Sequence, residues 1–163
     1  MAPTFTPIPG GEPAARVKLY WQEGYYWQDK KYEFTKFCMQ CKNSCSVGNK
    51  IEITKCSSSN RQKFVRVEGD RTIRPAMASN LCFQRYSVDE DLTLEYCDSG
   101  TDQKFEIVGT AWRKNGKFEI QPVKLKSQET CVTNPHHPRI GENIVAQWCT
   151  RARRHQTASW TLY

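Results

Sequence analysis

The chain has 163 residues, a net charge of +7 and a mean hydropathy of −0.72, and 12% of its residues are aromatic. This length suits one domain with a single core and is too short for two. No apolar run approaches the length of a membrane helix, so the composition predicts a protein without a membrane span.

The charge is distributed unevenly along the sequence. Residues 1–69 contain 11 basic and 6 acidic residues, residues 70–110 contain 4 and 8, and residues 111–163 contain 9 and 3. An acidic middle between two basic ends favours a protein with one side that faces a polyanion. The basic residues are not interleaved with aromatic residues that stack on bases, which argues against nucleic-acid binding.

Residues 1–16 form a proline-rich N-terminal extension to a single domain at residues 17–163. A segment with so little to bury is usually disordered by itself. Either its own domain or a protein partner would have to hold it in place. It lacks the charged start and apolar middle of a secretory signal.

An aromatic cluster follows at residues 18–21 and 25–27. Its simplest interpretation is a strand packed into the core, and a sugar-stacking platform is the alternative. We expect Leu19 and Trp21 to pair with a terminal strand at residues 160–163 and to close the structure into a ring.

One sequence unit occurs three times. Apolar residues two apart lead to a cysteine, and an aromatic residue preceded by Gln-x follows. The three units are 51–56 with Gln62-Lys63-Phe64, 92–97 with Gln103-Lys104-Phe105, and 144–149 with Ala158-Ser159-Trp160. The third has three extra residues before its aromatic and lacks the glutamine. Strand-period alternation and a regular recurrence predict an all-β repeat fold, with no convincing helix and with repeats at roughly 17–69, 70–110 and 111–163.

Six of the eight cysteines follow the same repeat. Equivalent positions predict the disulfides Cys38–Cys56, Cys82–Cys97 and Cys131–Cys149, and Cys41 and Cys45 remain for a fourth, local bridge. A zinc site made by Cys38, Cys41, Cys45 and Cys56 is the rival interpretation, although it would break the threefold pattern. So many cysteines in a short chain favour an oxidising compartment, such as the extracellular space of a secreted protein.

The three spaced motifs resemble the β-trefoil of ricin B-type lectins, over about residues 17–163. Residues 70–75 are also similar to a stretch found at a repeat boundary in that family. The resemblance implies twelve strands, six in a barrel and six in a hairpin cap, with the aromatics Phe64, Phe105 and Trp160 in the core. It also implies that each repeat can hold a shallow sugar pocket.

In that family, an aspartate two residues after the first cysteine binds sugar hydroxyls, together with a stacking aromatic and an asparagine just before the Gln-x-aromatic motif. Here the aspartate position holds Gln40, Gln84 and Thr133, and the asparagine position holds Arg61 and Asp102. All three pockets therefore depart from the pattern. The best surviving candidate is in the second repeat, where Gln84, Arg85, Tyr86 and Asp102 occur. The alternative is that Asp102 caps a turn and Tyr86 fills a hairpin.

Basic residues gather in the third repeat at Lys124 and Lys126 and, in the inserted loop, at Arg151, Arg153 and Arg154. The arginines could bind sulfate, carboxylate or phosphate in a bidentate manner, or could simply solvate the loop. His136, His137 and His155 have no partner at metal-ligand spacing, and residues 89–91 form an acidic hairpin tip with weak calcium binding as a minor alternative. We expect no metal, no cofactor and no catalytic residues.

The sequence thus predicts a non-catalytic carbohydrate-binding domain with divergent sugar sites, for a glycan or polyanionic polysaccharide that is acidic or sulfated. The alternative is an interaction protein that has lost sugar binding and docks on a protein partner through residues 1–16. A trefoil that inhibits a hydrolase through its loops is a third interpretation.

Overall fold

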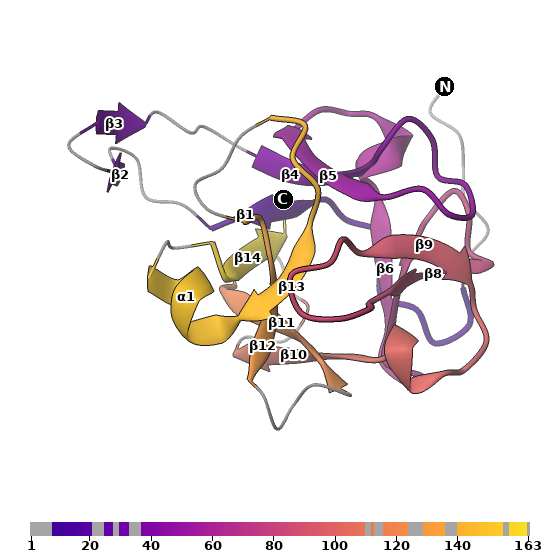
Figure 1. Cartoon of the computed structure of the whole chain (residues 1–163). Coiled ribbons are helices and arrows are strands. Elements are labelled where there is room, and N and C mark those ends of the chain that lie inside the picture. Colours follow the sequence, from indigo (N-terminus) through magenta and orange to yellow (C-terminus); the bar gives the residue numbers. More distant parts are fainter. Residues whose placement is uncertain are drawn as a thin grey trace.

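The computed structural model describes residues 8–20, 25–27, 30–32, 37–109, 112, 116–123, 129–135, 140–154 and 157–162, with only the backbone given for 25–27 and 30–32. Within these ranges the chain is built mostly of short antiparallel strands (Figure 1). No helix in the described part is long and apolar enough to cross a membrane.

Twelve strands form three sets of four. The first set is β1 (Val17–Leu19), β4 (Phe37–Cys41), β5 (Ile51–Lys55) and β6 (Phe64–Val67). The second is β7 (Thr72–Pro75), β8 (Leu81–Gln84), β9 (Thr93–Tyr96) and β10 (Phe105–Gly109). The third is β11 (Phe118–Pro122), β12 (Thr130–Thr133), β13 (Val145–Trp148) and β14 (Ser159–Leu162). The predicted β-trefoil is confirmed.

The first and fourth strands of each set form a closed barrel. Between sets, β6 pairs with β7, β10 with β11 and β14 with β1. Within sets, the first strand meets the fourth at three equivalent places: Ala15 with Phe64, Arg71 with Phe105, and Phe118 with Trp160. The expected pairing of Leu19 with the terminal strand is present opposite Trp160, whereas Trp21 lies outside the described residues.

The middle strands of each set form three hairpins that cap the barrel. Equivalent backbone bonds join neighbouring hairpins: Gly48 N–H to Leu94 O, Asp89 N–H to Ala146 O, and Gly141 N–H to Ile53 O, at 2.7, 2.7 and 2.8 Å. The three donors all have positive φ, at 83°, 69° and 87°. The turn therefore requires a left-handed backbone in every repeat, which two repeats supply with glycine and one with aspartate.

The acidic hairpin tip belongs to this cap. Asp91 accepts from Lys50 at 2.7 Å and from Asn143 at 3.0 Å, and Asp89 accepts from Gln147 at 3.1 Å. Both carboxylates are therefore engaged by donors of neighbouring hairpins, and their role in the fold is to join the three repeats.

The core fills the barrel and the space beneath the cap. Phe64, Phe105 and Trp160 are fully buried in one cluster, as predicted. The indole of Trp160 donates to the carbonyl of Val132 at 3.0 Å, which satisfies its only polar group. Strand alternation explains the pattern, because Ile51 and Ile53 face inward while the residues between them do not.

All eight cysteines are paired as predicted. The disulfides are Cys38–Cys56, Cys41–Cys45, Cys82–Cys97 and Cys131–Cys149. No free cysteine is present, so the alternative zinc site, which needs thiolates, is wrong. A cysteine pair closes the hairpin in each repeat and constrains the unfolded chain.

The described part of the N-terminal extension lies against its own domain. Ala15 and Phe64 exchange two backbone hydrogen bonds, at 2.9 and 3.0 Å, and Glu12 N–H donates to Arg66 O at 2.8 Å. Gly11 allows this close approach, because a Cβ there would lie 2.9 Å from Val65 Cγ1. Residues 8–16 thus add a strand-like edge to β6 and leave less backbone for a partner.

Three details differ from the sequence-based expectations. A further hairpin, β2 (Tyr25–Trp27) and β3 (Lys30–Tyr32), lies between β1 and β4. The loop expected at the third-repeat insertion is a short helix, α1 (Cys149–Arg154), too brief to show periodicity in sequence. Tyr20, placed in the aromatic core cluster from sequence, has 42% of its surface exposed because it lies just beyond β1.

Candidate functional site

The glutamine of the Gln-x-aromatic motif is buried in the second repeat and connects three of its segments. Gln103 is the last residue of a 3-10 turn, η2 (Thr101–Gln103). This turn directs the Gln103 side chain toward the hairpin. Its Nε2 donates to Gln84 Oε1 at 2.9 Å and to the carbonyl of Tyr96 at 2.8 Å. Its Oε1 accepts from the backbone N–H of Asp98 at 2.9 Å. Gln84, predicted as a sugar ligand, thus gives its oxygen to the fold.

The first repeat has the same arrangement, and here the amide nitrogen of the equivalent glutamine also has a partner within the protein. Gln62, at the end of η1 (Asn60–Gln62), donates to Gln40 Oε1 at 3.0 Å. The amide nitrogen of Gln40 then donates to Glu52 Oε1 at 3.3 Å. Arg61, at the family's asparagine position, donates to the carbonyl of Cys41 at 3.2 Å. The polar groups of this repeat are therefore used within the protein.

The second repeat leaves donors and acceptors for a ligand. In the described part of the chain, the Nε2 group of Gln84 has no hydrogen-bond partner. Next to it, the buried Arg85 donates from Nη2 to Asp102 Oδ1 at 3.1 Å and from its backbone N–H to Asp102 O at 3.0 Å. Asp102 still has 43% of its side chain exposed, so its carboxylate is oriented by Arg85 and open to solvent.

Tyr86 lies on the same hairpin and presents its ring at the surface, with 39% exposed. Its backbone carbonyl accepts from Arg85 Nη1. Its hydroxyl lies 3.1 Å from Thr93 Oγ1 and 3.3 Å from Glu95 Oε2, and Thr93 donates to Glu95 at 2.7 Å. The ring is thus tethered through its hydroxyl, which gives an exposed aromatic surface beside the carboxylate of Glu95, while Arg85 links the backbone of Tyr86 to Asp102.

The third repeat replaces the glutamine by hydroxyl contacts. Ala158 occupies the glutamine position, and the hydroxyl of Thr133 lies 2.6 Å from that of Thr157. Thr157 is fixed in turn by its backbone N–H, which donates to Ala152 O in α1 at 2.9 Å. Thr133 is fully buried, so this position offers no sugar ligand.

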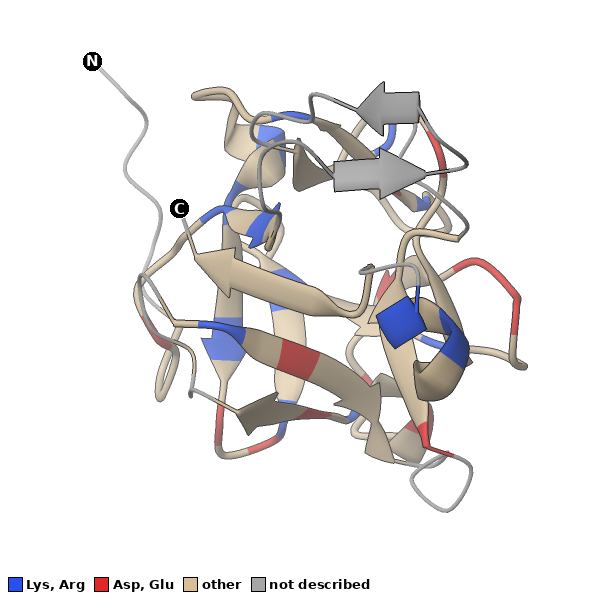
Figure 2. Ribbon diagram, turned by 90° about the vertical axis from the view of Figure 1, so that its left-hand side faces the viewer, with Lys and Arg blue, Asp and Glu red and all other residues tan. Residues whose placement is uncertain are grey.

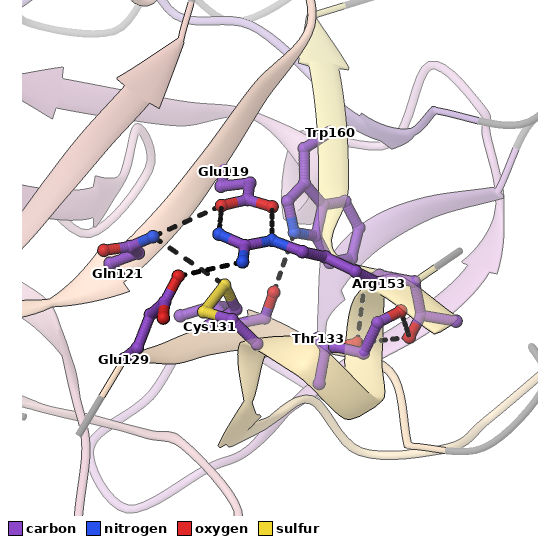
Figure 3. A network of polar contacts seen from close by, with 11 residues as sticks. Glu119, Gln121, Glu129, Cys131, Thr133, Arg153 and Trp160 are labelled. Carbon is purple, nitrogen blue, oxygen red and sulfur yellow. Dashed lines mark hydrogen bonds and ion pairs between the residues drawn. A yellow bond between two sulfur atoms is a disulfide. The ribbon is translucent and has the colours of Figure 1, made fainter. Parts of the chain in front are cut away.

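Arg153 of α1 is fixed by two carboxylates (Figure 3). Its Nε and Nη2 donate to the two oxygens of Glu119, and its Nη1 donates to Glu129, each at 2.8 Å. The hydrogen bonds from Arg153 hold the pKa of Glu119 below its usual value, against the opposing effect of burial. Arg153 is therefore engaged in the fold and is not a free anion ligand.

Two further arginines of α1 were also predicted as anion ligands. Arg151 and Arg154 are exposed on α1. Figure 2 shows Lys and Arg interspersed with Asp and Glu on this side of the molecule. Lys124, Lys126 and the three histidines lie outside the described residues. A continuous polyanion-binding side, expected from the charge distribution, therefore stays a prediction.

One group of potential metal ligands occurs in the described part of the chain. Glu119 lies near the sulfurs of Cys131 and Cys149, with all ligand atoms within 4.8 Å of one another. Those two sulfurs form a disulfide and carry no thiolate charge, and both oxygens of Glu119 bind Arg153. This cluster lacks the chemistry of a metal site.

Sequence reasoning named four members of the second-repeat cluster and missed two. Gln84, Arg85, Tyr86 and Asp102 gather as predicted, while Thr93 and Glu95 were not recognised. Their signal was present, since Thr93 and Glu95 alternate with the buried Leu92 and Leu94 and so share the outer face of β9.

Comparisons with known proteins support the fold. No protein-family model matches the chain, and no curated protein matches its sequence. Among solved structures, the designed threefold-symmetric protein ThreeFoil has a TM-score of 0.66 at 12% identity, over 91% of this chain and 96% of that one. The β-trefoil lectin of the Vibrio vulnificus hemolysin/cytolysin, solved with N-acetyl-D-lactosamine, has a TM-score of 0.60 at 16% identity, over 92% and 93%.

A third similar structure is a non-toxic homologue of type II RIPs from bitter gourd, in complex with α-methyl-D-galactoside. It has a TM-score of 0.63 at 14% identity, and the match covers 94% of this chain and 48% of that one. At identities this low, the structural similarity shows a shared β-trefoil fold and nothing more. The ligand has to be argued from the site itself.

Proposed function

We propose that this protein is a non-catalytic carbohydrate-binding domain whose sugar site is in the second repeat. The observation that carries the proposal is the exposed ring of Tyr86, whose hydroxyl contacts Glu95 and whose backbone carbonyl is bound by Arg85, the ion-pair partner of Asp102. An aromatic face with adjacent carboxylates suits a pyranose, because one face of the sugar is apolar and its edge carries hydroxyl donors.

The three repeats differ in what they leave open, and this difference selects the second. Gln40 is saturated by Gln62 and Glu52 in the first repeat, and Thr133 is buried in the third. Gln84 keeps its Nε2 donor in the described part of the second repeat. A donor from Gln84 and an acceptor from Asp102 together can hold two hydroxyls of one sugar.

The charge of this site favours a neutral sugar. Asp102 and Glu95 contribute two negative charges and Arg85 one positive charge, so the cluster carries a net charge of −1. A carboxylate or sulfate placed on it would meet repulsion. The acidic or sulfated glycan predicted from the basic composition therefore requires another surface.

The alternative role, docking on a protein partner through residues 1–16, has less support. Residues 8–16 pair with β6 of their own domain, and Ile8 packs against Val65, Val67 and Ala76. This occupies the backbone and apolar groups that such a partner would use. The four disulfides are consistent with an oxidising compartment, and we propose that the protein is secreted.

A panel of immobilised neutral glycans tests this function, with Tyr86→Ala as the variant and Tyr96→Ala as its matched control. Tyr96 is on the same hairpin and is 61% exposed, but it contributes only its backbone carbonyl to the network. We expect binding by the wild type, a loss of about tenfold or more in Tyr86→Ala, corresponding to about 1.4 kcal/mol, and little change in Tyr96→Ala.

A second variant, Asp102→Asn, keeps the size of the side chain and removes its charge. Weaker binding of the same glycans would support the role of the carboxylate, since hydrogen bonds to a charged acceptor are stronger. Equal losses in Tyr86→Ala and Tyr96→Ala, or silence of the wild type across the panel, would reject the second-repeat site.

A further inference from the structure

A groove of about 670 Å³ lies on the outer wall of the barrel, beside α1, where β10 of the second repeat adjoins the third repeat. Its polar, aromatic and aliphatic lining includes Tyr20, Val108, Lys117, Glu119, Arg153 and Ser159. This volume is within the range of small-ligand sites, roughly 300–1,000 Å³, and is sufficient for a sugar residue.

The floor of the groove is a row of outward-facing residues across four strands. Val108 on β10 is opposite Glu119 on β11, and Glu119 is opposite Ser159 on β14. Tyr20 completes the row, because its backbone N–H donates to Ser159 O at 2.9 Å. The intervening Phe118 and Trp160 point into the core, so strand alternation directs the row to solvent.

The polar wall above this row is preorganised by an ion pair. Arg153 reaches from α1 and binds both oxygens of Glu119, which fixes the two polar groups relative to each other. Preorganised groups of this kind lose little entropy on binding.

The other end of the groove is aromatic and cationic. Tyr20 is 42% exposed and Val108 is 40% exposed, which gives an apolar surface for one face of a sugar ring. Lys117 Nζ lies 5.6 Å from the centroid of the Tyr20 ring. Among the described residues, Lys117 has no ion-pair partner within 4 Å. Arg153 is already paired with Glu119 and Glu129, so Lys117 is the cation of the lining that can meet an anionic group.

The groove has no counterpart in the other two repeats. Lys63 and Lys104 stand where Ser159 is, and Ala76 and Val123 stand where Tyr20 is, as the equivalent backbone bonds show. The six-residue helix that supplies Arg153 lies in the connection that is three residues longer in the third repeat than in the other two. The surface is thus distinct from the pockets that the resemblance implied.

We propose that this groove is a second saccharide site that accepts one anionic pyranose, either a uronate or a sugar sulfate. The ring lies against Tyr20 and Val108, the anionic group pairs with Lys117, and hydroxyls contact the Glu119–Arg153 pair. This rests on the proposed carbohydrate-binding function, and it gives the acidic glycan predicted from composition a location that the second repeat does not offer.

The test compares two tyrosines and two classes of glycan by titration calorimetry or NMR. The probes are a glucuronate-containing disaccharide, a 3-sulfated galactoside, and the neutral counterpart of each. Tyr20→Ala is expected to weaken the anionic probes about tenfold and to leave neutral binding unchanged, and Tyr86→Ala is expected to do the reverse. Comparing the two anionic probes shows whether carboxylate or sulfate is preferred.

Lys117→Gln sharpens the test, with the exposed Lys55→Gln of the first repeat as its control. We expect about a fivefold loss for the anionic probes in Lys117→Gln, and a weaker dependence of their affinity on salt, because one charge pair is gone. Tyr20 and Lys117 are both exposed, so these variants should fold, and thermal unfolding checks that they do.

Different failures have different meanings. Neutral binding that depends on Tyr86, together with anionic binding that ignores Tyr20 and Lys117, overturns the groove site alone. Anionic probes that do not bind while neutral ones do have the same consequence. No binding of either class by the wild type overturns both the groove and the carbohydrate-binding function.

Discussion

The second and third repeats use different chemistry to stabilise the same corner of the trefoil, which is the junction between the cap hairpin and the last barrel strand. In the second, Gln103 is a buried hub with three hydrogen bonds to Gln84, Tyr96 and Asp98. In the third, an alanine takes its place, and a longer connection forms α1, which contributes Thr157 contacts and the Arg153–Glu119 pair. The comparison teaches that one fold position can be held by a buried amide or by a surface helix.

The difference has a consequence for the surface. The glutamine hub is compact and leaves Asp102 and Tyr86 at an open hairpin face. The helix extends outward and adds a wall to the barrel, and this wall borders the groove lined by Tyr20, Lys117 and Arg153. Substitutions at the two corners should therefore have different energetic and functional effects.

The largest expected effect is on stability in the second repeat. Gln103→Leu should lower the free energy of unfolding by about 2–3 kcal/mol, because it leaves the Asp98 N–H, the Tyr96 carbonyl and the Gln84 oxygen without partners. Thr157→Val in the third repeat should cost about 1 kcal/mol, since its hydroxyl makes fewer contacts. Urea unfolding of the oxidised protein measures both.

The exposed neighbour Thr101→Ala serves as the control for Gln103→Leu and should change stability by less than about 0.5 kcal/mol. If Gln103→Leu and Thr157→Val proved equally costly, the distinction between a buried hub and a helix-supported corner would be wrong.

A smaller effect is expected for the Glu119–Arg153 pair of the third repeat. Arg153 lowers the pKa of Glu119 in the folded protein, so the pair stabilises the fold above the ordinary pKa of a glutamate. That stabilisation is lost as the pH falls through the lowered value. Glu119→Gln should therefore cost about 1 kcal/mol at pH 7, a modest value because Arg153 is 43% exposed, and progressively less as the pH falls below the ordinary pKa of a glutamate.

Chemical unfolding of the wild type, Glu119→Gln and the exposed control Glu90→Gln across this pH range measures the difference. A cost for Glu119→Gln that stays constant from pH 7 to pH 3 would show that the side chain acts by packing rather than by charge.

The sequence predicted much of the fold because the same unit recurs. The equivalent spacing of the cysteines identified three disulfides and left Cys41 and Cys45 for the fourth, and the Gln-x-aromatic motif identified Phe64 and Phe105 as core residues. The second-repeat cluster was also predicted, because its residues lie close to these motifs in the chain. Recurrence made the inference about the fold possible without knowledge of long-range contacts.

Other features depended on geometry that no local pattern contains. The helix α1 has only six residues, fewer than two turns, so its periodicity could not be read. The groove brings together Tyr20, Val108, Glu119 and Ser159 from four strands, and their alignment depends on strand register. The aromatic run at residues 18–21 did not reveal that Tyr20 faces outward, since a one-residue shift reverses the face.

The smallest expected effect concerns the three equivalent cap turns. Gly48→Ala and Gly141→Ala should each cost about 1 kcal/mol from the left-handed backbone alone, because no atom lies near the added Cβ. Asp89→Gly should change stability by less than about 0.5 kcal/mol, since relief of strain offsets the lost bond from Gln147. Thermal unfolding resolves these differences, and a large loss in Asp89→Gly would contradict the equivalence of the turns.

The most direct test of the account is an amide NMR titration of the wild type with a neutral and an anionic oligosaccharide. The account predicts that the neutral sugar shifts amide signals around Gln84–Tyr86 and Asp102, and that the anionic sugar shifts those around Tyr20, Gly109 and Ser159. Both sugars perturbing the same amides, or shifts centred on Gln40 in the first repeat, would contradict it.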